Sequence, residues 1–364
     1  MKKRVNLILN ITVIILTLGA VLGVAMVASA KYGGEIWKTS LLLVAGAIVA
    51  GLINAFMHEF GHLIAGRRNG FILSDMAVWF FRFHRVREKI HFDFTLPLEQ
   101  AGYTEFFPSS TDDVLKRYKK VATGGLVASF ICMLIGVAPM FLTKFIPVEA
   151  YAFWAMLFPV GVYYLTGNGL PMTTDGAKND GAVIVSAKKQ DDDGKVMEGL
   201  LGIQSELYDG KTPAEIDEKY YFELPQLPED NLNFMLLLNA RYNYYLDKGD
   251  FEGAKKTINR LLSLEEYMPK PLSKVIKTDA LYAYCTFDKN EGRADELMYE
   301  LQKHLSSNDV VAIRVKTAYL AFIKKEREQL DDFFNKWVEE AEKSVFEGME
   351  LFEKKLLERL KEEL

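Results

Sequence analysis

Cysteine and histidine are scarce in this sequence. Its 364 residues include 2 cysteines and 5 histidines. Cys132 and Cys285 lie in different halves of the chain, so they do not form the disulfide framework that stabilises small secreted domains. Two of the few histidines, His58 and His62, are only four residues apart.

A strong excess of one charge is also missing. Lysine and arginine number 44 and aspartate and glutamate 49, which gives a net charge of -5. A nucleic-acid-binding domain usually carries a basic surface, so we expect no nucleic-acid partner. Hydrophobic residues reach 49% and charged residues 26%, and this mixture indicates an apolar part and a separate charged part.

Charged side chains are absent from four long stretches. Each stretch is long enough to cross the hydrocarbon core of a lipid bilayer, which predicts an integral membrane protein with about four transmembrane helices. They are residues 5–30, 39–57, 121–143 and 150–174. The first, with Lys2-Lys3-Arg4 before it and Ala28-Ser29-Ala30 at its end, is similar to a signal peptide. It exceeds the usual length of a signal core, so we expect a retained span.

Basic residues predict the orientation in the membrane. They are concentrated at the N-terminus and in the segment 67–120, whereas the loops 31–38 and 144–149 carry few. The positive-inside rule therefore predicts that both termini and the middle segment are cytoplasmic.

The middle segment has the composition of strands. Residues 76–94 are rich in β-branched and aromatic side chains, while Leu96-Pro97-Leu98 and Gly102 are expected at turns. We expect a small β-hairpin region whose edge could hold a peptide in extended form. His84 and His91 lie in this region and are expected to be ordinary surface histidines.

The sequence His58-Glu59-Phe60-Gly61-His62 ends the second apolar stretch. On a helix, residues four apart lie on one face, so His58 and His62 can bind one metal ion, and the motif is typical of zinc sites. Glu59 is placed to take a proton from a water at that metal. Ionisable residues inside a membrane span point to a functional site. Arg67 follows His58 by about 13 Å of helix, which predicts a buried site on the cytosolic side of the midplane.

A catalytic zinc site needs a third protein ligand. Asp175 and Asp180, each followed by glycine, are the candidates after the fourth apolar stretch. Asp180 precedes an uncharged run to Ala187, which gives it a depth similar to that of His58. Asn168-Gly169 and Pro171 before them are expected to break the helix.

These features resemble the site-2 protease family of intramembrane zinc metalloproteases. The resemblance covers about residues 39–190, with weaker similarity at Leu96-Pro97-Leu98, Gly102-Tyr103 and Gly124-Gly125. It implies Zn²⁺ held by His58, His62 and Asp180, with Asp175 as the alternative third ligand. It also implies Glu59 as the catalytic base, and Asn168 and Pro171 in substrate binding. A transmembrane protein or peptide substrate and a bacterial plasma membrane follow from the same resemblance.

The remainder of the chain, residues 191–364, is charged and predicted to be helical. Tyr245 to Ala254 is similar to a tetratricopeptide hairpin, with Gly249 at the turn, and vaguer copies follow at 282–305 and 318–337. An irregular helical bundle is an alternative. The last run, 346–364, is predicted to be an amphipathic helix with an ordinary solvated face. This half could bind a cytosolic protein partner.

The sequence thus predicts a mainly α protein with two domains. Residues 1–190 would form a transmembrane zinc metalloprotease domain with a small β-hairpin region, and 191–364 a cytoplasmic α-helical repeat-like domain. The expected function is intramembrane endoproteolysis of transmembrane substrates near the cytosolic side. One alternative is a non-catalytic membrane scaffold with a structural metal site. Another is a membrane-anchored zincin of a different type, with a glutamate as its third ligand.

Overall fold

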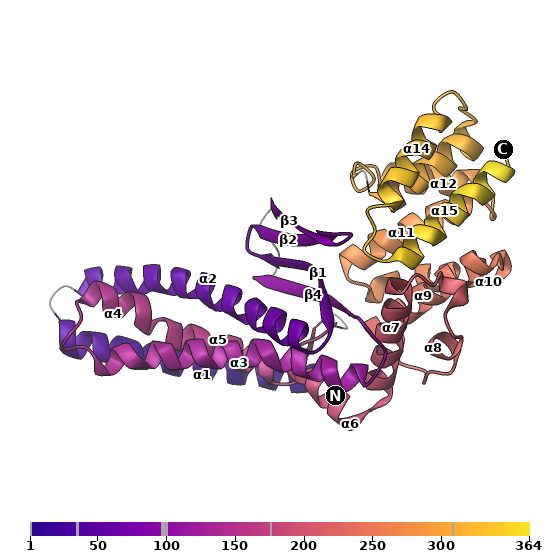
Figure 1. Ribbon diagram of the computed structural model, residues 1–364. Coiled ribbons are helices and arrows are strands. Elements are labelled where there is room, and N and C mark those ends of the chain that lie inside the picture. Colours follow the sequence, from indigo (N-terminus) through magenta and orange to yellow (C-terminus); the bar gives the residue numbers. More distant parts are fainter. Residues whose placement is uncertain (1, 34–35, 96–100, 175–176, 308) are drawn as a thin grey trace.

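The computed structural model describes residues 2–33, 36–95, 101–174, 177–307 and 309–364. The protein is mainly helical, with a small antiparallel sheet (Figure 1). Four helical segments of the described chain are long and apolar enough to cross a membrane. They are α1 (Lys2–Tyr32), α2 (Ile36–Arg68), α3 (Val114–Phe141) and the pair α4 (Val148–Ala155) and α5 (Leu157–Gly169). The prediction of about four helices that are long and apolar enough to cross a membrane is confirmed.

The apolar helices lie side by side as an elongated bundle (Figure 1). Large apolar side chains point out of it, as shown by the exposed fractions of Leu22 (62%), Ile48 (59%) and Leu134 (51%). Such a surface is unfavourable in water and favourable in lipid, so it indicates a membrane protein. The sheet and the remaining helices lie at the end of the bundle where α2 ends and α1 begins.

Two glycines bring α2 and α3 into backbone contact. A Cβ atom on Gly61 would come within 2.4 Å of the Gly124 carbonyl oxygen, and a Cβ on Gly124 within 2.4 Å of the Gly61 oxygen. Small residues at helix crossings permit this approach in membrane proteins. Because Gly61 lies between His58 and His62 in sequence, the contact presses the motif against α3.

The sheet has four strands in the order β3-β2-β1-β4, and all pairs are antiparallel. The strands are β1 (Phe71–Val78), β2 (Phe81–Val86), β3 (Lys89–Phe94) and β4 (Gly102–Pro108). The prediction of a turn at Gly102 was wrong, because Gly102 pairs with Val78 and begins β4. Leu96-Pro97-Leu98, also expected at a turn, lie outside the described residues.

The fourth span ends where the sequence predicted a break. Helix α5 stops at Gly169, and the chain continues through β5 (Thr173–Thr174) and β6 (Ala177–Lys178) into α6 (Asp180–Lys189). Pro171 lacks a backbone donor, so the helix cannot continue through it undisturbed. The span is also interrupted at Met156, between α4 and α5, which the sequence pattern did not indicate.

The remaining elements of the described chain are helices. They are α7 (Asp192–Tyr208), α8 (Lys219–Phe222), α9 (Leu232–Lys248), α10 (Phe251–Leu262), α11 (Lys270–Cys285), α12 (Glu291–Glu300), α13 (Val310–Ala318), α14 (Leu330–Ala341) and α15 (Glu347–Glu362), with short 3-10 helices at Pro213–Glu215 and Glu265–Tyr267 and a π-helix at Tyr319–Lys324. Below, α7–α15 are called the helical part.

The helices α9 and α10 form the expected helical hairpin. Gly249 adopts φ 80° at the turn, a conformation that favours glycine, and Ala254 is fully buried between the helices. The final helix α15 is amphipathic, and its apolar face, with Phe352 and Leu356, is buried in the core of the helical part. Helix α7 also packs on the other half of the chain, where Met197 contacts the cluster around Phe71.

Candidate metal and catalytic centre

Three side chains from two distant parts of the chain meet at the end of the bundle. Helix α2 presents His58 and His62 on one face, and Asp180 stands at the first position of α6. The His58 and His62 Nε2 atoms are 3.2 Å apart, and Asp180 Oδ2 lies 3.2 Å from the first and 3.3 Å from the second. In the described residues these three form one group that could hold a metal ion.

The triangle of candidate ligand atoms has the dimensions of a tetrahedral metal site. Zinc bonds to nitrogen and oxygen of about 2.0–2.1 Å hold neighbouring ligand atoms about 3.3–3.4 Å apart in a tetrahedron. Asp180 Oδ2 is buried and accepts no hydrogen bond from the protein. A buried carboxylate oxygen without a donor is costly unless a cation stabilises it. The residues therefore fit a bound divalent metal ion.

The Nδ1 atom of each imidazole also has a hydrogen-bond partner. His62 Nδ1 lies 2.9 Å from the Val121 carbonyl oxygen, and His58 Nδ1 lies 2.9 Å from Ser129 Oγ. A carbonyl oxygen only accepts, so His62 Nδ1 carries the proton and Nε2 keeps its lone pair for a metal. Partners of this kind fix the orientation and tautomer of metal-binding histidines. Both come from α3.

Asp180 is positioned by the residue before it. Asn179 caps α6 by accepting a hydrogen bond from the Ala182 amide, and it donates to the carbonyl oxygens of Gly167 (2.8 Å) and Leu170 (2.7 Å). These bonds tie the start of α6 to the end of α5. Gly181 permits the contact, because a Cβ there would lie 2.1 Å from the Gly169 carbonyl oxygen.

Glu59 is buried beside the two histidines and is held by the sheet. Thr104 of β4 donates a hydrogen bond to Glu59 Oε2 at 2.6 Å. Gly102, on the same strand, would bring a Cβ within 3.0 Å of Glu59 Cγ and 3.3 Å of Oε1. A glycine at this position of β4 therefore leaves room for the glutamate. One carboxylate oxygen is bonded, and Oε1 accepts no side-chain hydrogen bond among the described residues.

A cavity of about 260 Å³ adjoins the triad. Asn168 lines it, although its amide donates to the Tyr164 carbonyl oxygen of its own helix at 3.0 Å. Pro171 is exposed and does not line the cavity. The walls are His58, Glu59, His62, Tyr103, Thr104, Phe106, Tyr118, Val121, Ala122, Asn168, Lys178, Asn179, Asp180 and Val183.

The other candidates lie elsewhere. His84 and His91 are opposite residues of β2 and β3, outside the metal-binding group. Asp175, the alternative third ligand, lies outside the described residues. Sequence reasoning missed Ser129, Thr104 and Asn179. An asparagine directly before a helix is a known capping signal and could have revealed Asn179, whereas Ser129 and Thr104 carry no local signal.

No family model matches the sequence, and no curated protein or solved structure matches it either.

Proposed function

We propose that the protein is an intramembrane zinc metalloendopeptidase that resembles the site-2 protease family. The observation that carries the proposal is the triangle of His58, His62 and Asp180, with edges of 3.2–3.3 Å, at the end of an apolar helix with Glu59 beside it. A zinc ion bound there would polarise the scissile carbonyl and make a water molecule more acidic.

Glu59 is the general base in this proposal. Its Oε1 takes a proton from the attacking water and then delivers it to the nitrogen of the leaving amine. Thr104 fixes the carboxylate through Oε2, so the reacting oxygen has a defined direction. Holding the base in place before the reaction removes part of the entropic cost of the step.

We propose that the substrate binds at the outer edge of β4. Tyr103, Thr104 and Phe106 of this strand line the cavity, and no described strand pairs with β4 on the side away from β1. A peptide bond inside a helix is shielded by helical hydrogen bonds, so a transmembrane substrate must unwind before cleavage. Adding it as a strand beside β4 holds the peptide extended.

The substrate is cut near the cytosolic face in this proposal. The start of α1, the end of α2, helix α6 and the helical part lie at the same end of the bundle (Figure 1). The candidate ligands belong to α2 and α6. The basic residues at the start of α1, the end of α2 and the start of α3 support a cytosolic position for that end. The helical part, with its tetratricopeptide-like hairpin, would recruit a cytosolic partner or control access of the substrate.

The number of ligands supports catalysis over a purely structural metal site. Structural zinc is almost always held by four protein ligands, whereas catalytic zinc keeps one position open. The described residues supply three ligands, and a cavity adjoins them.

The proposal is tested with Glu59→Gln. Purified protein carrying this change should retain zinc, and cells expressing it should lose membrane-protein fragments that the unmodified protein produces. The matched control is Glu149→Gln, since Glu149 is exposed and pairs with Lys38 at 3.6 Å far from the site. Identical fragments in cells with the unmodified protein and with Glu59→Gln would refute the mechanism.

A further inference from the structure

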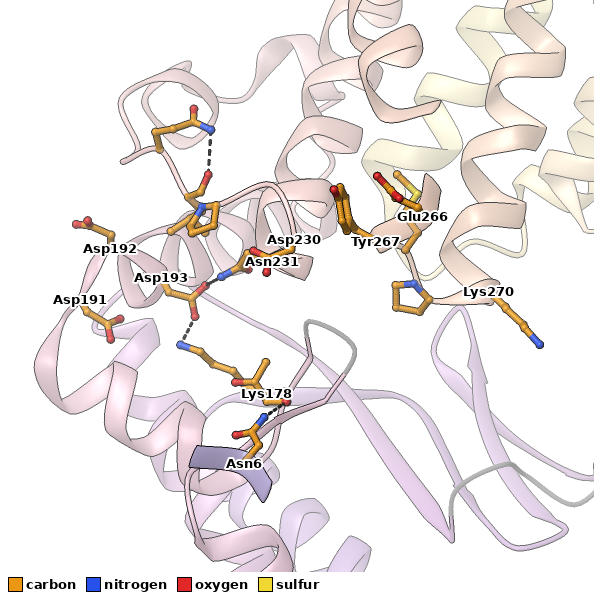
Figure 2. Close-up of a pocket in the computed structure, with 16 residues that line it drawn as sticks. Asn6, Lys178, Asp191, Asp192, Asp193, Asp230, Asn231, Glu266, Tyr267 and Lys270 are labelled. Atoms are coloured by element: carbon orange, nitrogen blue, oxygen red, sulfur yellow. Dashed lines mark hydrogen bonds and ion pairs between the residues drawn. The ribbon is translucent and has the colours of Figure 1, made fainter. Parts of the chain in front are cut away.

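A largely buried ion pair connects the segment that carries Asp180 to the helical part. Lys178, at the end of β6, extends its ammonium group to Asp193 in the first turn of α7 (Figure 2). The exposed fraction is 19% for the Lys178 side chain and 11% for that of Asp193. A pair shielded from water in this way constrains both partners, because a lone buried charge is costly.

The direction of Asp193 is set from the other side. Its Oδ1 atom accepts a hydrogen bond from the side-chain amide of Asn231 (2.7 Å), while Oδ2 faces Lys178 (Figure 2). The side-chain amide of Asn233 donates to the same Oδ1 atom at 3.2 Å. Asn231 is the residue that caps α9. The Asp193 carboxylate therefore connects β6, the strand just before Asp180, to the hairpin of α9 and α10.

Lys178 lines two neighbouring cavities. It lines the cavity beside the metal triad, and it also lines a larger cleft of about 890 Å³ between the start of α7 and the segments that precede α9 and α11. One residue, Asn179, separates it from Asp180. An ammonium group released from Asp193 would therefore share a cavity with the Asp180 carboxylate. At low dielectric it would pair with that carboxylate and compete with a metal ion.

We propose that Asp193 is a positioning residue of the metal centre. It supplies the charge that holds the Lys178 ammonium, which also donates to Ser186 Oγ, away from Asp180, and thereby keeps the third ligand free for a cation. The inference rests on the proposed function, because it concerns the same metal centre. The helical part thereby influences the metal centre, because Asn231 and Asn233 fix the orientation of Asp193.

The test compares the zinc affinity of full-length variants by chelator competition. Asp193→Asn keeps an oxygen that can accept from Asn231 but loses the charge that holds Lys178. We expect its zinc affinity to fall about 10–100-fold. The double variant Lys178→Met/Asp193→Asn removes the competing ammonium, and its affinity should return close to that of the unmodified protein. A purely structural role of the pair would leave the double variant as weak as the single one.

Asp192→Asn is the matched control. Asp192 is the preceding residue, its side chain is 66% exposed, and its partner Lys195 lies 3.9 Å away. The zinc affinity of Asp192→Asn should therefore equal that of the unmodified protein. Unchanged affinity in Asp193→Asn, or equal weakness of the single and double variants, would overturn the inference. If Asp193→Asn alone does not fold, weak binding by a folded double variant overturns it equally. Failure of the unmodified protein to bind zinc would instead remove the proposed function.

Discussion

Gly125 lies directly against the imidazole of His62. A Cβ atom at position 125 would come within 2.4 Å of His62 Nε2, and within 2.8 Å of His58 Cε1. No real Cβ contact is that short, so a side chain there must displace both imidazole rings. The glycine allows α3 to approach the site that α2 presents.

Gly125→Ala should therefore abolish or strongly weaken zinc binding while the protein still folds. Alanine favours a helix over glycine by about 1 kcal/mol, so lost helix propensity cannot explain a loss of metal. Zinc content after dialysis against a chelator measures the effect. The control is Gly51→Ala on α2, where a Cβ would meet nothing within 4 Å. Normal zinc content in Gly125→Ala would contradict the geometry of the triad.

Asn179→Ala should lower the zinc affinity of the protein. The change removes the cap of α6 and both hydrogen bonds to the end of α5, so Asp180 is no longer fixed. We expect a loss of about 10–100-fold, as for other residues that orient a metal ligand. Isothermal titration of the metal-free protein with zinc measures it.

Asn168→Ala should separate substrate binding from metal binding. Among the described residues, its amide donates only to the Tyr164 carbonyl oxygen in its own helix, so the zinc affinity should stay unchanged. If Asn168 holds substrate, as the family resemblance implies, cleavage should fall. A comparison of zinc affinity with cleavage of a substrate found by the Glu59→Gln experiment decides this. Reduced zinc affinity in Asn168→Ala would assign the residue to the metal centre instead.

The helical part contains a buried charge cluster whose stability depends on pH. Arg314 donates hydrogen bonds to Asp279 (2.8 Å) and Glu353 (2.6 Å), and Trp337 donates to Glu353 (2.9 Å). Burial raises the pKa of Asp279 to about 6, against the opposing effect of Arg314. Burial raises the pKa of Glu353 as well. One cation thus faces two carboxylates away from water.

Between about pH 4 and pH 6, the folded state retains a proton that the unfolded chain has already released. The contribution of this cluster to the free energy of unfolding therefore falls as pH rises through that window. Asp279→Asn cannot ionise, so its stability relative to the unmodified protein should rise by about 1–3 kcal/mol between pH 4 and pH 7.

Unfolding of the full-length protein in detergent at both pH values measures this difference. Asp332→Asn, at an exposed position of α14, is the control and should show no such change. A relative stability of Asp279→Asn that is the same at both pH values would mean that Asp279 is ionised throughout.

Several features could be predicted from the sequence because they are local. The absence of charge over long stretches predicted the apolar helices, since charged groups are costly in lipid. The spacing of His58 and His62 on one helix follows from 3.6 residues per turn. Pro171 and the residues before it predicted the end of α5. The prediction of a turn at Gly102 was wrong because the sequence does not show that a strand must leave room for Glu59.

The sequence alone therefore determined the apolar helices and two of the three candidate ligands. Only the tertiary structure decided that Asp180 meets the two histidines, and that Ser129, Val121 and Thr104 orient the site. These contacts join segments far apart in the chain. They depend on two backbones that touch at Gly61 and Gly124, and on Asn179, which ties α6 to α5. Such packing is set by the shapes of several elements together, which no short stretch of sequence contains.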